Sequence, residues 1–185
     1  MNRILAGGAK GRRLASPRGL ETRPTSSRVR QTLFDILQGL VPGCRFLDLF
    51  AGNGGVGLEA LSRGAARVVL VDSAPGALAA LRENVRTLSF LPGSVEVFSQ
   101  DARVAALALS DAGSLFDIVY LDPPYASPLY EVLLETAGSL LLQGGQVVAE
   151  HFKKRPLPAT IGGLSKTREV RVGDHCLSFY SREGA

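Results

Sequence analysis

The pattern of apolar and polar residues changes at position 45 of this chain. Beyond it, apolar runs of strand length alternate with segments whose apolar residues recur at helical spacing, which is typical of βα units around a buried parallel sheet. The predicted strands are 45–50, 67–72, 94–98, 116–121 and 143–149, and the predicted helices lie near 55–63, 74–88, 102–109 and 128–140. Two later runs, 166–172 and 176–182, predict a terminal hairpin added to the sheet.

An extension with a different pattern precedes these units. A glycine pair separates two short runs, Arg3–Ala6 and Lys10–Leu14, and this spacing favours a hairpin. Thr25 is a candidate N-cap for a helix with one apolar face, and Pro42-Gly43 is expected to end that helix. The sequence therefore predicts a hairpin and a helix ahead of the α/β core.

Length and composition predict one domain. The 185 residues, 45% of them apolar, suffice for a single buried core, with the extension at 1–42 and the core at 43–185. No apolar run approaches the ~18 residues of a membrane span, and no signal-peptide core is present, so we expect a cytoplasmic protein without a membrane anchor. Cys44 and Cys176 lack the spacing of a metal site or redox pair, so we expect reduced thiols and no bound metal.

Positive charge is concentrated at the beginning of the chain. Residues 1–30 hold eight Lys and Arg against one acid, whereas residues 31–185 hold thirteen against sixteen, so the two segments carry +7 and −3. A basic arm of this kind can bind the phosphates of a nucleic acid, or it can be a solvated leader. Charge alone leaves both interpretations open.

A glycine-rich segment follows the first predicted core strand. Residues Gly52 to Gly57 stand between an apolar strand and a helix, where backbone N–H groups can approach a ligand closely. The Gly-x-Gly-x-x-Gly spacing, with Asp72 ending the next strand where an acid can bind ribose hydroxyls, is typical of sites for nucleoside-containing cofactors. NAD and S-adenosylmethionine both fit this pattern, and a turn that only permits tight packing is the structural alternative.

Two further carboxylates stand near predicted strand ends. Asp48 lies inside an apolar strand, where it would be desolvated unless it meets a cation or N–H donors, and the ammonium group of S-adenosylmethionine is one suitable partner. Asp101 follows the third core strand. It can accept a hydrogen bond from an adenine amino group or cap the helix that starts at Ala102, and both interpretations stay open.

The tetrapeptide Asp122-Pro123-Pro124-Tyr125 follows the fourth core strand, at the edge where open α/β sheets place their ligands. An exocyclic amino group of a nucleobase is a poor nucleophile because its lone pair is delocalised into the ring. Asp122 and the Pro123 carbonyl can accept hydrogen bonds from its two N–H groups. Pro124 stiffens the turn, and Tyr125 offers a face on which an extruded base can stack. The motif predicts methylation of an exocyclic base nitrogen without distinguishing guanine from adenine, and a proline-rich turn is the structural alternative.

These motifs together resemble a known family. Asp48-Leu49-Phe50-Ala51-Gly52 with Asp122-Pro123-Pro124-Tyr125 resembles the amino-methyltransferases of bases, whose α/β fold is a Rossmann-like, seven-stranded, mostly parallel sheet with an antiparallel end. Five further segments resemble the bacterial 16S ribosomal RNA guanine-N2 methyltransferase family: Gly11–Leu14, Arg23–Thr25, Arg28–Arg30, Leu33–Leu37 and Gly57–Ala65. The resemblance covers roughly residues 3–182, with Gln31 and Asn53 standing where Glu and Ser are expected.

The resemblance implies S-adenosylmethionine as the cofactor. It implies a guanine of 16S ribosomal RNA, in an assembled or partly assembled small subunit, as the substrate, and we expect a monomer. The implied catalytic residues are Asp122, Pro123, Pro124 and Tyr125. The candidate cofactor contacts are Thr22, Arg23, Thr25, Asp48, Phe50, Gly52, Asn53, Gly54, Asp72, Ser73, Asp101 and Ala102. The candidate RNA contacts are Lys10, Arg12, Arg13, Arg23, Arg28 and Arg30.

Three alternatives remain at this point. An adenine-N6 methyltransferase of RNA or DNA shares the catalytic motif, although no segment is long enough for the target-recognition insertion of the DNA enzymes, which favours RNA. An NAD-dependent oxidoreductase would leave the tetrapeptide and the basic arm unexplained. A non-catalytic RNA-binding assembly factor would rest on the arm alone, and neither His151 nor His175 is assigned a role.

Overall fold

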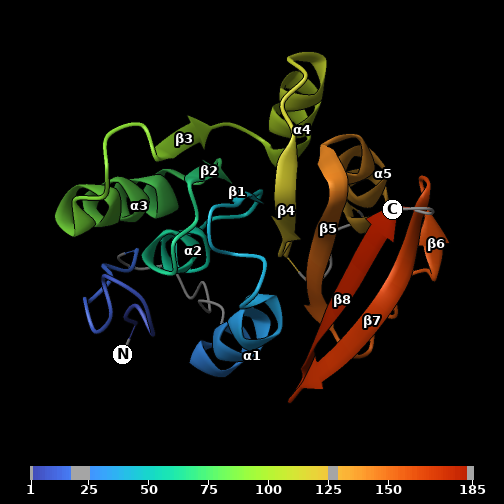
Figure 1. The fold of residues 1–185 in the computed structure, drawn as a ribbon, viewed down its shortest axis with the longest axis horizontal. Coiled ribbons are helices and arrows are strands. Elements are labelled where there is room, and N and C mark those ends of the chain that lie inside the picture. The colour runs from blue at the N-terminus through green and yellow to red at the C-terminus, as the bar shows by residue number, and fades with distance from the viewer. Residues whose placement is uncertain (1, 18–25, 125–128, 183–185) are drawn as a thin grey trace.

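The computed structural model describes residues 2–17, 26–124 and 129–182. One eight-stranded sheet runs through the molecule in the order β3-β2-β1-β4-β5-β8-β7-β6, with helices on both faces (Figure 1). The strands are β1 (Arg45–Asp48), β2 (Arg67–Asp72), β3 (Val95–Ser99), β4 (Phe116–Leu121), β5 (Leu141–Phe152), β6 (Thr160–Ile161), β7 (Leu164–Val172) and β8 (His175–Arg182). The helices are α1 (Ser27–Leu37), α2 (Gly57–Ser62), α3 (Pro75–Leu88), α4 (Ala102–Asp111) and α5 (Leu129–Ser139).

The sheet is parallel in its first five strands and antiparallel at one end. β1 pairs in parallel with β2 and β4, β2 with β3, and β4 with β5. β8 then pairs antiparallel with β5, and β7 with β8. The predicted α/β fold class, a mostly parallel Rossmann-like sheet with an antiparallel C-terminal hairpin, is confirmed.

One strand was not predicted. β6 pairs with the beginning of β7 and adds an eighth, two-residue edge strand to the seven expected. Gly162 and Gly163 form the turn between them with φ values of 56° and 77°, a left-handed conformation that glycine adopts without strain. A strand of two residues has no room for the alternation by which strands are recognised in a sequence.

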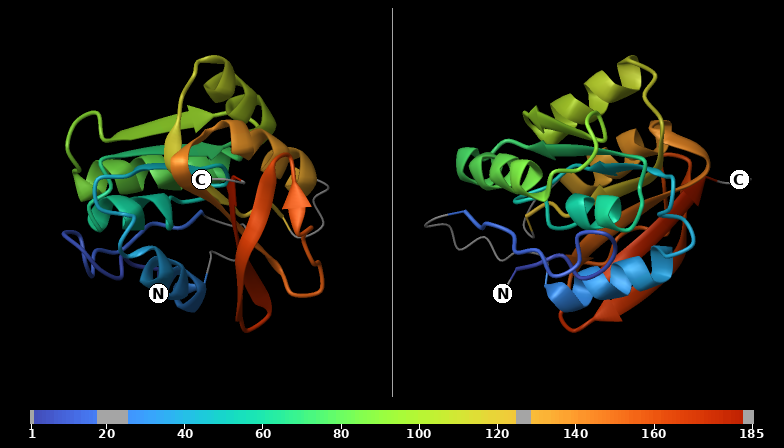
Figure 2. Two further views of the ribbon diagram at one scale, coloured as in Figure 1. Left: turned by 45° about the vertical axis from the view of Figure 1, so that its right-hand side comes forward. Right: turned by 60° about the vertical axis from the view of Figure 1, so that its left-hand side comes forward.

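Two apolar layers cover the sheet. Helices α1, α2 and α3 pack on one face, and α4 and α5 pack on the other (Figure 2). Along β2, Val68 and Leu70 belong to the first layer while Val69 and Val71 belong to the second, and all four side chains are fully buried. Burial on both faces explains why this strand is a continuous apolar run.

The N-terminal arm, residues 2–15, folds back on itself as the predicted hairpin, with the Ile4 N–H donating to the Arg12 carbonyl and the Leu14 N–H to the Asn2 carbonyl, each at 3.0 Å. Arg3 and Arg13 form one isolated antiparallel bridge, and no regular strand occurs in the described part of the arm. The arm also packs on α2: Ile4 is fully buried, and a Cβ on Gly7 would lie 1.7 Å from the Ser62 carbonyl oxygen. Pairing within the arm and contact with α2 together determine its shape.

Helix α1 begins at Ser27. The side chain of Ser26 accepts a hydrogen bond from the Val29 N–H at 3.2 Å and so caps the helix. Thr25, the predicted cap, lies outside the described residues. The helix ends at Leu37, five residues before Pro42, and none of the described helices is long and apolar enough to cross a membrane.

Candidate active site

Four predicted acidic residues lie at one edge of the sheet. Asp48 and Asp72 are the last residues of β1 and β2, while Asp101 and Asp122 follow the ends of β3 and β4. Because β1 to β4 are parallel, their carboxyl ends share this edge. The fold thus brings together residues that are up to 74 positions apart, from Asp48 to Asp122.

The glycine-rich loop is held against Asp72. The Gly52 N–H donates to one Asp72 carboxylate oxygen at 2.8 Å, and the Ala74 N–H donates to the other at 2.8 Å. Gly52 has a φ of 55° and a Cβ there would meet open space, so its backbone is accessible from that side. A carboxylate has about four lone-pair positions, so Asp72 retains acceptor capacity for hydroxyl groups such as those of a ribose.

Asp48 is a buried carboxyl group. The residue is only 1% exposed, and the Phe50 N–H donates to its side chain at 3.3 Å. Burial raises the pKa of Asp48 to about 7, against the opposing effect of the N–H groups of Phe50 and Gly57. Among the described residues no Lys or Arg pairs with it, so Asp48 suits a cationic ligand group such as an ammonium.

The raised pKa makes stability depend on pH. Between pH about 4 and 7 the folded protein holds a proton on Asp48 that the unfolded chain releases, so stability falls as pH rises through this window, by on the order of 4 kcal/mol. Asp48→Asn cannot ionise and should remove this dependence. We expect the urea midpoints of the two proteins to diverge between pH 4.5 and 8, with the variant gaining relative to the wild type, whereas parallel curves would contradict the burial of an ionising group.

Asp101 acts as a helix cap in this structure. Its side chain accepts a hydrogen bond from the Arg103 N–H at 2.9 Å and from the Arg103 guanidinium at 3.1 Å. The side-chain hydrogen bond from Arg103 lowers the pKa of Asp101, so this carboxyl is ionised at neutral pH. The capping interpretation is confirmed, and contact with adenine by Asp101 or the buried Ala102 stays a prediction.

Other candidate cofactor contacts differ in what they offer. Phe50 is half-buried and Ser73 is exposed, so both side chains reach the surface near the loop. Asn53 is 7% exposed, and its side-chain amide donates to the Ala15 carbonyl at 2.7 Å. Asn53 therefore fastens the N-terminal arm with its side-chain amide, and its backbone carbonyl accepts a hydrogen bond from the Asn84 side chain at 2.8 Å.

The turn after β4 is tied to β5. The Tyr130 hydroxyl donates to the Glu150 carbonyl at 2.8 Å and lies 3.3 Å from the Pro123 carbonyl. A hydroxyl has one proton and a carbonyl has two lone pairs, so the Pro123 oxygen can still accept from a bound amino group. Pro123 is buried, whereas Asp122 is half-exposed and reachable by a ligand.

The chain is similar to proteins of a known family. Residues 2–181 match the profile of a family described as "Conserved hypothetical protein 95". The chain belongs to this family. Among its relatives, "Ribosomal RNA small subunit methyltransferase D" of Escherichia coli (strain K12) is 35% identical over 184 residues, which cover 98% of this chain and 90% of that protein. The resemblance to the small-subunit ribosomal RNA methyltransferases is thereby confirmed.

Solved structures agree with the family assignment. A hypothetical protein from Thermus thermophilus superposes with a TM-score of 0.84 at 34% identity, over 98% of this chain and 99% of that one. A SAM-dependent methyltransferase from Agrobacterium tumefaciens superposes with a TM-score of 0.62 at 18% identity, over 83% and 60% of the two chains. The fold is that of the S-adenosylmethionine-dependent methyltransferases. The relatives named as ribosomal RNA methyltransferases, rather than the fold, remove the reason to consider an NAD-dependent oxidoreductase.

The predicted RNA contacts that lie within the described residues fall into two groups. Lys10, Arg12, Arg13 and Arg28 are exposed, as an RNA contact must be. Arg30 is 2% exposed, so its assignment as an RNA contact was wrong.

The Arg30 guanidinium is used inside the protein. It donates to the carbonyls of Arg3 at 2.6 Å and Gly55 at 3.3 Å, and it lies 4.0 Å from the Glu59 carboxylate. Arg30 therefore joins the N-terminal arm to the glycine-rich loop and α2.

A buried polar cluster beside the site was not predicted from the sequence. The Tyr120 hydroxyl donates to the Glu150 carboxylate, and Nδ1 of His175 lies 2.6 Å from the other Glu150 oxygen. Burial and the nearby charges of Glu150 and Asp122 raise the pKa of Tyr120 well above its usual value. Glu150 is the acid that ends an otherwise apolar run, which is the one signal that could have identified the cluster.

Four predicted site residues are not placed. Thr22, Arg23, Thr25 and Tyr125 lie outside the described residues. The described part of the site therefore consists of the loop with Asp48 and Asp72, the cap Asp101, and the turn at Asp122 and Pro123.

Proposed function

We propose that this protein transfers a methyl group from S-adenosylmethionine to the exocyclic N2 amino group of a guanine in 16S ribosomal RNA. The supporting observation is that Asp122 and the Pro123 carbonyl stand at the same sheet edge as the loop fastened to Asp72. A relative named as a small-subunit ribosomal RNA methyltransferase supports the RNA class. The choice of N2 of guanine rests on the motif resemblance alone.

The residues present fit S-adenosylmethionine. Asp48, buried and without a described cationic partner, is suited to its ammonium group, and Asp72 is suited to its ribose hydroxyls. Asp101 and Ala102 follow β3 at the same edge and would contact the adenine. When bound, the cofactor supplies an electrophilic methyl group on a cationic sulfur.

Asp122 and Pro123 act on the target base. Each accepts a hydrogen bond from one N–H of the exocyclic amino group. These two hydrogen bonds turn the nitrogen lone pair out of conjugation and toward the methyl donor. The nitrogen becomes strongly acidic once it has accepted the methyl group, so Asp122 needs little basicity to accept its proton. Tyr125 stacks on the extruded base. Positioning therefore supplies most of the rate enhancement.

The basic arm binds the RNA. Lys10, Arg12, Arg13 and Arg28 are exposed, and residues 1–30 carry +7 against −3 for the remainder. The substrate is the RNA of an assembled or partly assembled small subunit in the cytoplasm, and the protein acts as a monomer of one domain. Exposure of these cations, rather than their number, is what supports this assignment.

Mass mapping of methylated nucleotides tests the proposal. Ribosomal RNA is prepared from cells with and without this protein, digested, and searched for N2-methylguanosine. We expect one position of 16S ribosomal RNA to lose its methyl group completely in the absence of the protein. Loss of N6-methyladenosine instead would favour the adenine alternative, and an unchanged map would favour a non-catalytic assembly factor.

A further inference from the structure

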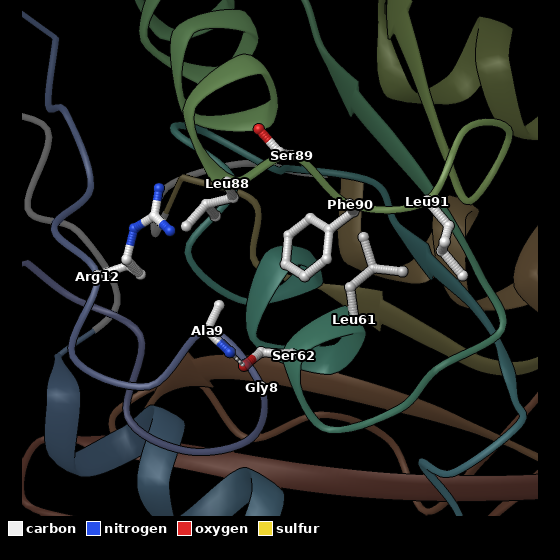
Figure 3. Close-up of a pocket in the computed structure, with 9 residues that line it drawn as sticks. All are labelled: Gly8, Ala9, Arg12, Leu61, Ser62, Leu88, Ser89, Phe90 and Leu91. Atoms are coloured by element: carbon white, nitrogen blue, oxygen red, sulfur yellow. Dashed lines mark hydrogen bonds between the residues drawn. The ribbon is translucent and has the colours of Figure 1, made fainter.

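A hollow lies between the N-terminal arm, the end of α2 and the loop from α3 to β3 (Figure 3). Its volume is about 340 Å³, at the lower end of the ~300–1,000 Å³ typical of small-molecule sites. The residues that line it are Gly8, Ala9, Arg12, Leu61, Ser62, Leu88, Ser89, Phe90 and Leu91. None of the candidate cofactor or catalytic residues is among them.

The hollow is remote from the methylation site. Helices α2 and α3 begin at the carboxyl edge of the sheet, and the hollow is lined by the residues at their opposite ends, Ser62 and Leu88. Asp122 follows the far end of β4, whose six residues at about 3.3 Å each span about 20 Å. A ligand in this hollow is therefore not the base that is methylated.

The lining offers an apolar surface for a flat ring. Leu61 and Leu88 are 8% and 6% exposed, and the ring of Phe90 lies between their side chains (Figure 3). Leu91, at the rim, is 80% exposed, more than any other large apolar side chain found exposed in the described residues. A half-buried aromatic ring beside an exposed leucine is a suitable platform for stacking a nucleobase.

A cation stands beside this platform. The Arg12 guanidinium donates to the Thr87 carbonyl at 2.5 Å, which holds it at the hollow, and a guanidinium has five N–H donors in all. Its neighbours Lys10 and Arg13 are exposed. The combination of an apolar platform with the Arg12 guanidinium is complementary to a nucleotide, with its flat base and its phosphate.

The loop that carries the platform is held in place. Ser89 has a φ of 51°, in the left-handed region, and its N–H donates to the Val85 carbonyl at 3.3 Å. Its hydroxyl turns back to the Arg86 carbonyl at 3.2 Å, away from the hollow. The two following residues, Phe90 and Leu91, line the hollow, with the Phe90 ring on the side toward the arm (Figure 3). The platform is thus formed before any ligand binds.

The polar groups that line the hollow have little capacity to form hydrogen bonds with the edge of a base. The Gly8 N–H donates to the Ser62 carbonyl at 2.8 Å, and the Ala9 N–H donates to the Ser62 hydroxyl at 2.9 Å. These polar groups are already paired, so stacking and charge remain as the means of recognition.

We propose that this hollow binds an unpaired nucleotide of the RNA substrate, at a distance from the methylated guanine. The base stacks on Phe90 and Leu91, and a phosphate contacts Arg12. The proposal rests on the proposed function in that it takes RNA to be the substrate. It adds that the RNA contacts the protein near both ends of the parallel strands, at the methylation site and at the hollow.

Matched variants test the hollow. Filter binding with unmodified 16S ribosomal RNA transcript is measured for the wild-type protein, for Leu91→Glu and for Arg12→Gln. The controls are Leu107→Glu, an exposed leucine on α4 at the other face of the sheet, and Arg168→Gln, an exposed arginine on β7. We expect about tenfold weaker binding for each hollow variant and a change of less than about twofold for each control.

Phe90 provides a second, independent readout. Phe90→Ala should weaken RNA binding about tenfold. Phe90→Tyr should bind the RNA about as tightly as the wild type, because tyrosine keeps the stacking face. Affinity for S-adenosylmethionine should stay unchanged in all variants, which establishes that they are folded. If hollow and control variants bind the transcript equally, the proposal is wrong.

Two further outcomes are distinguishable. If the hollow variants bind the naked transcript normally but bind small subunits more weakly, the hollow accepts a ribosomal protein and the nucleotide assignment is overturned. If they lose transcript affinity as expected but the wild-type protein transfers no methyl group to the RNA, the hollow proposal stands and only the proposed methylation fails.

Discussion

Methyl transfer is expected to fall by about 100- to 1,000-fold when Asp122 is replaced by alanine, because the amino group then loses the acceptor that orients its lone pair. Asp122 is half-buried and follows the end of β4, outside both apolar layers, so its removal should leave the core intact. The rate is measured in single turnover, with tritiated S-adenosylmethionine and small subunits that lack the modification. Affinity for S-adenosylmethionine, measured by calorimetry, should change by less than about twofold.

Asp122→Asn is the matched control. The amide keeps one acceptor oxygen at nearly the same position but loses the charge, so its rate should fall between those of the wild type and the alanine variant. If Asp122→Ala retained more than half of the wild-type rate, the assignment of Asp122 to the amino group would be incorrect. Loss of cofactor affinity in parallel with the rate would instead place Asp122 in the cofactor site.

The largest effect on stability is expected at Glu59. This fully buried carboxylate accepts the N–H groups of Leu5 at 2.7 Å and Ala6 at 3.0 Å, and it pairs with the Arg63 guanidinium at 2.8 Å. It is also 4.0 Å from Arg30, which is itself buried. Glu59→Ala would leave these donors without their acceptor, at a cost of about 3–5 kcal/mol in the free energy of unfolding.

Urea unfolding of Glu59→Ala and Glu96→Ala provides the comparison. Glu96 pairs with Arg67 at 2.6 Å, a shorter distance than any at Glu59, but both side chains are more than two-fifths exposed. Water already solvates these charges, so removing Glu96 should cost only about 0–1 kcal/mol. Similar losses in the two variants would mean that burial does not govern the strength of these contacts.

Most of the fold was predictable from the periodicity of apolar residues. Runs buried on both faces, such as Val68 to Val71, have no alternative to a central parallel strand, and the predicted 67–72 matches β2. The pairing within the arm was predictable, but its attachment to α2, more than fifty residues away, through contacts such as the Ala9 N–H with Ser62, was not. Periodicity reports local structure and contains no signal for such a contact.

The site was predictable where it lies on strand ends. Asp48 and Asp72 each end an apolar run, and parallel strands bring such ends together. Arg30 was misassigned because a charged residue within an amphipathic helix is usually solvated. Its partner Glu59 is 29 residues away, and only the folded structure reveals that both are buried.

The attachment of the arm has a consequence for synthesis on the ribosome. The arm is made first, but its acceptors come later: Glu59 receives the Leu5 and Ala6 N–H groups, and the Asn84 side chain binds both backbone groups of Ala15. The attachment of the first fifteen residues to the core therefore cannot be complete until residue 84 has left the exit tunnel. During that interval their positive charges are free to touch the RNA of the ribosome that is making them, the same class of molecule that we propose the finished enzyme modifies.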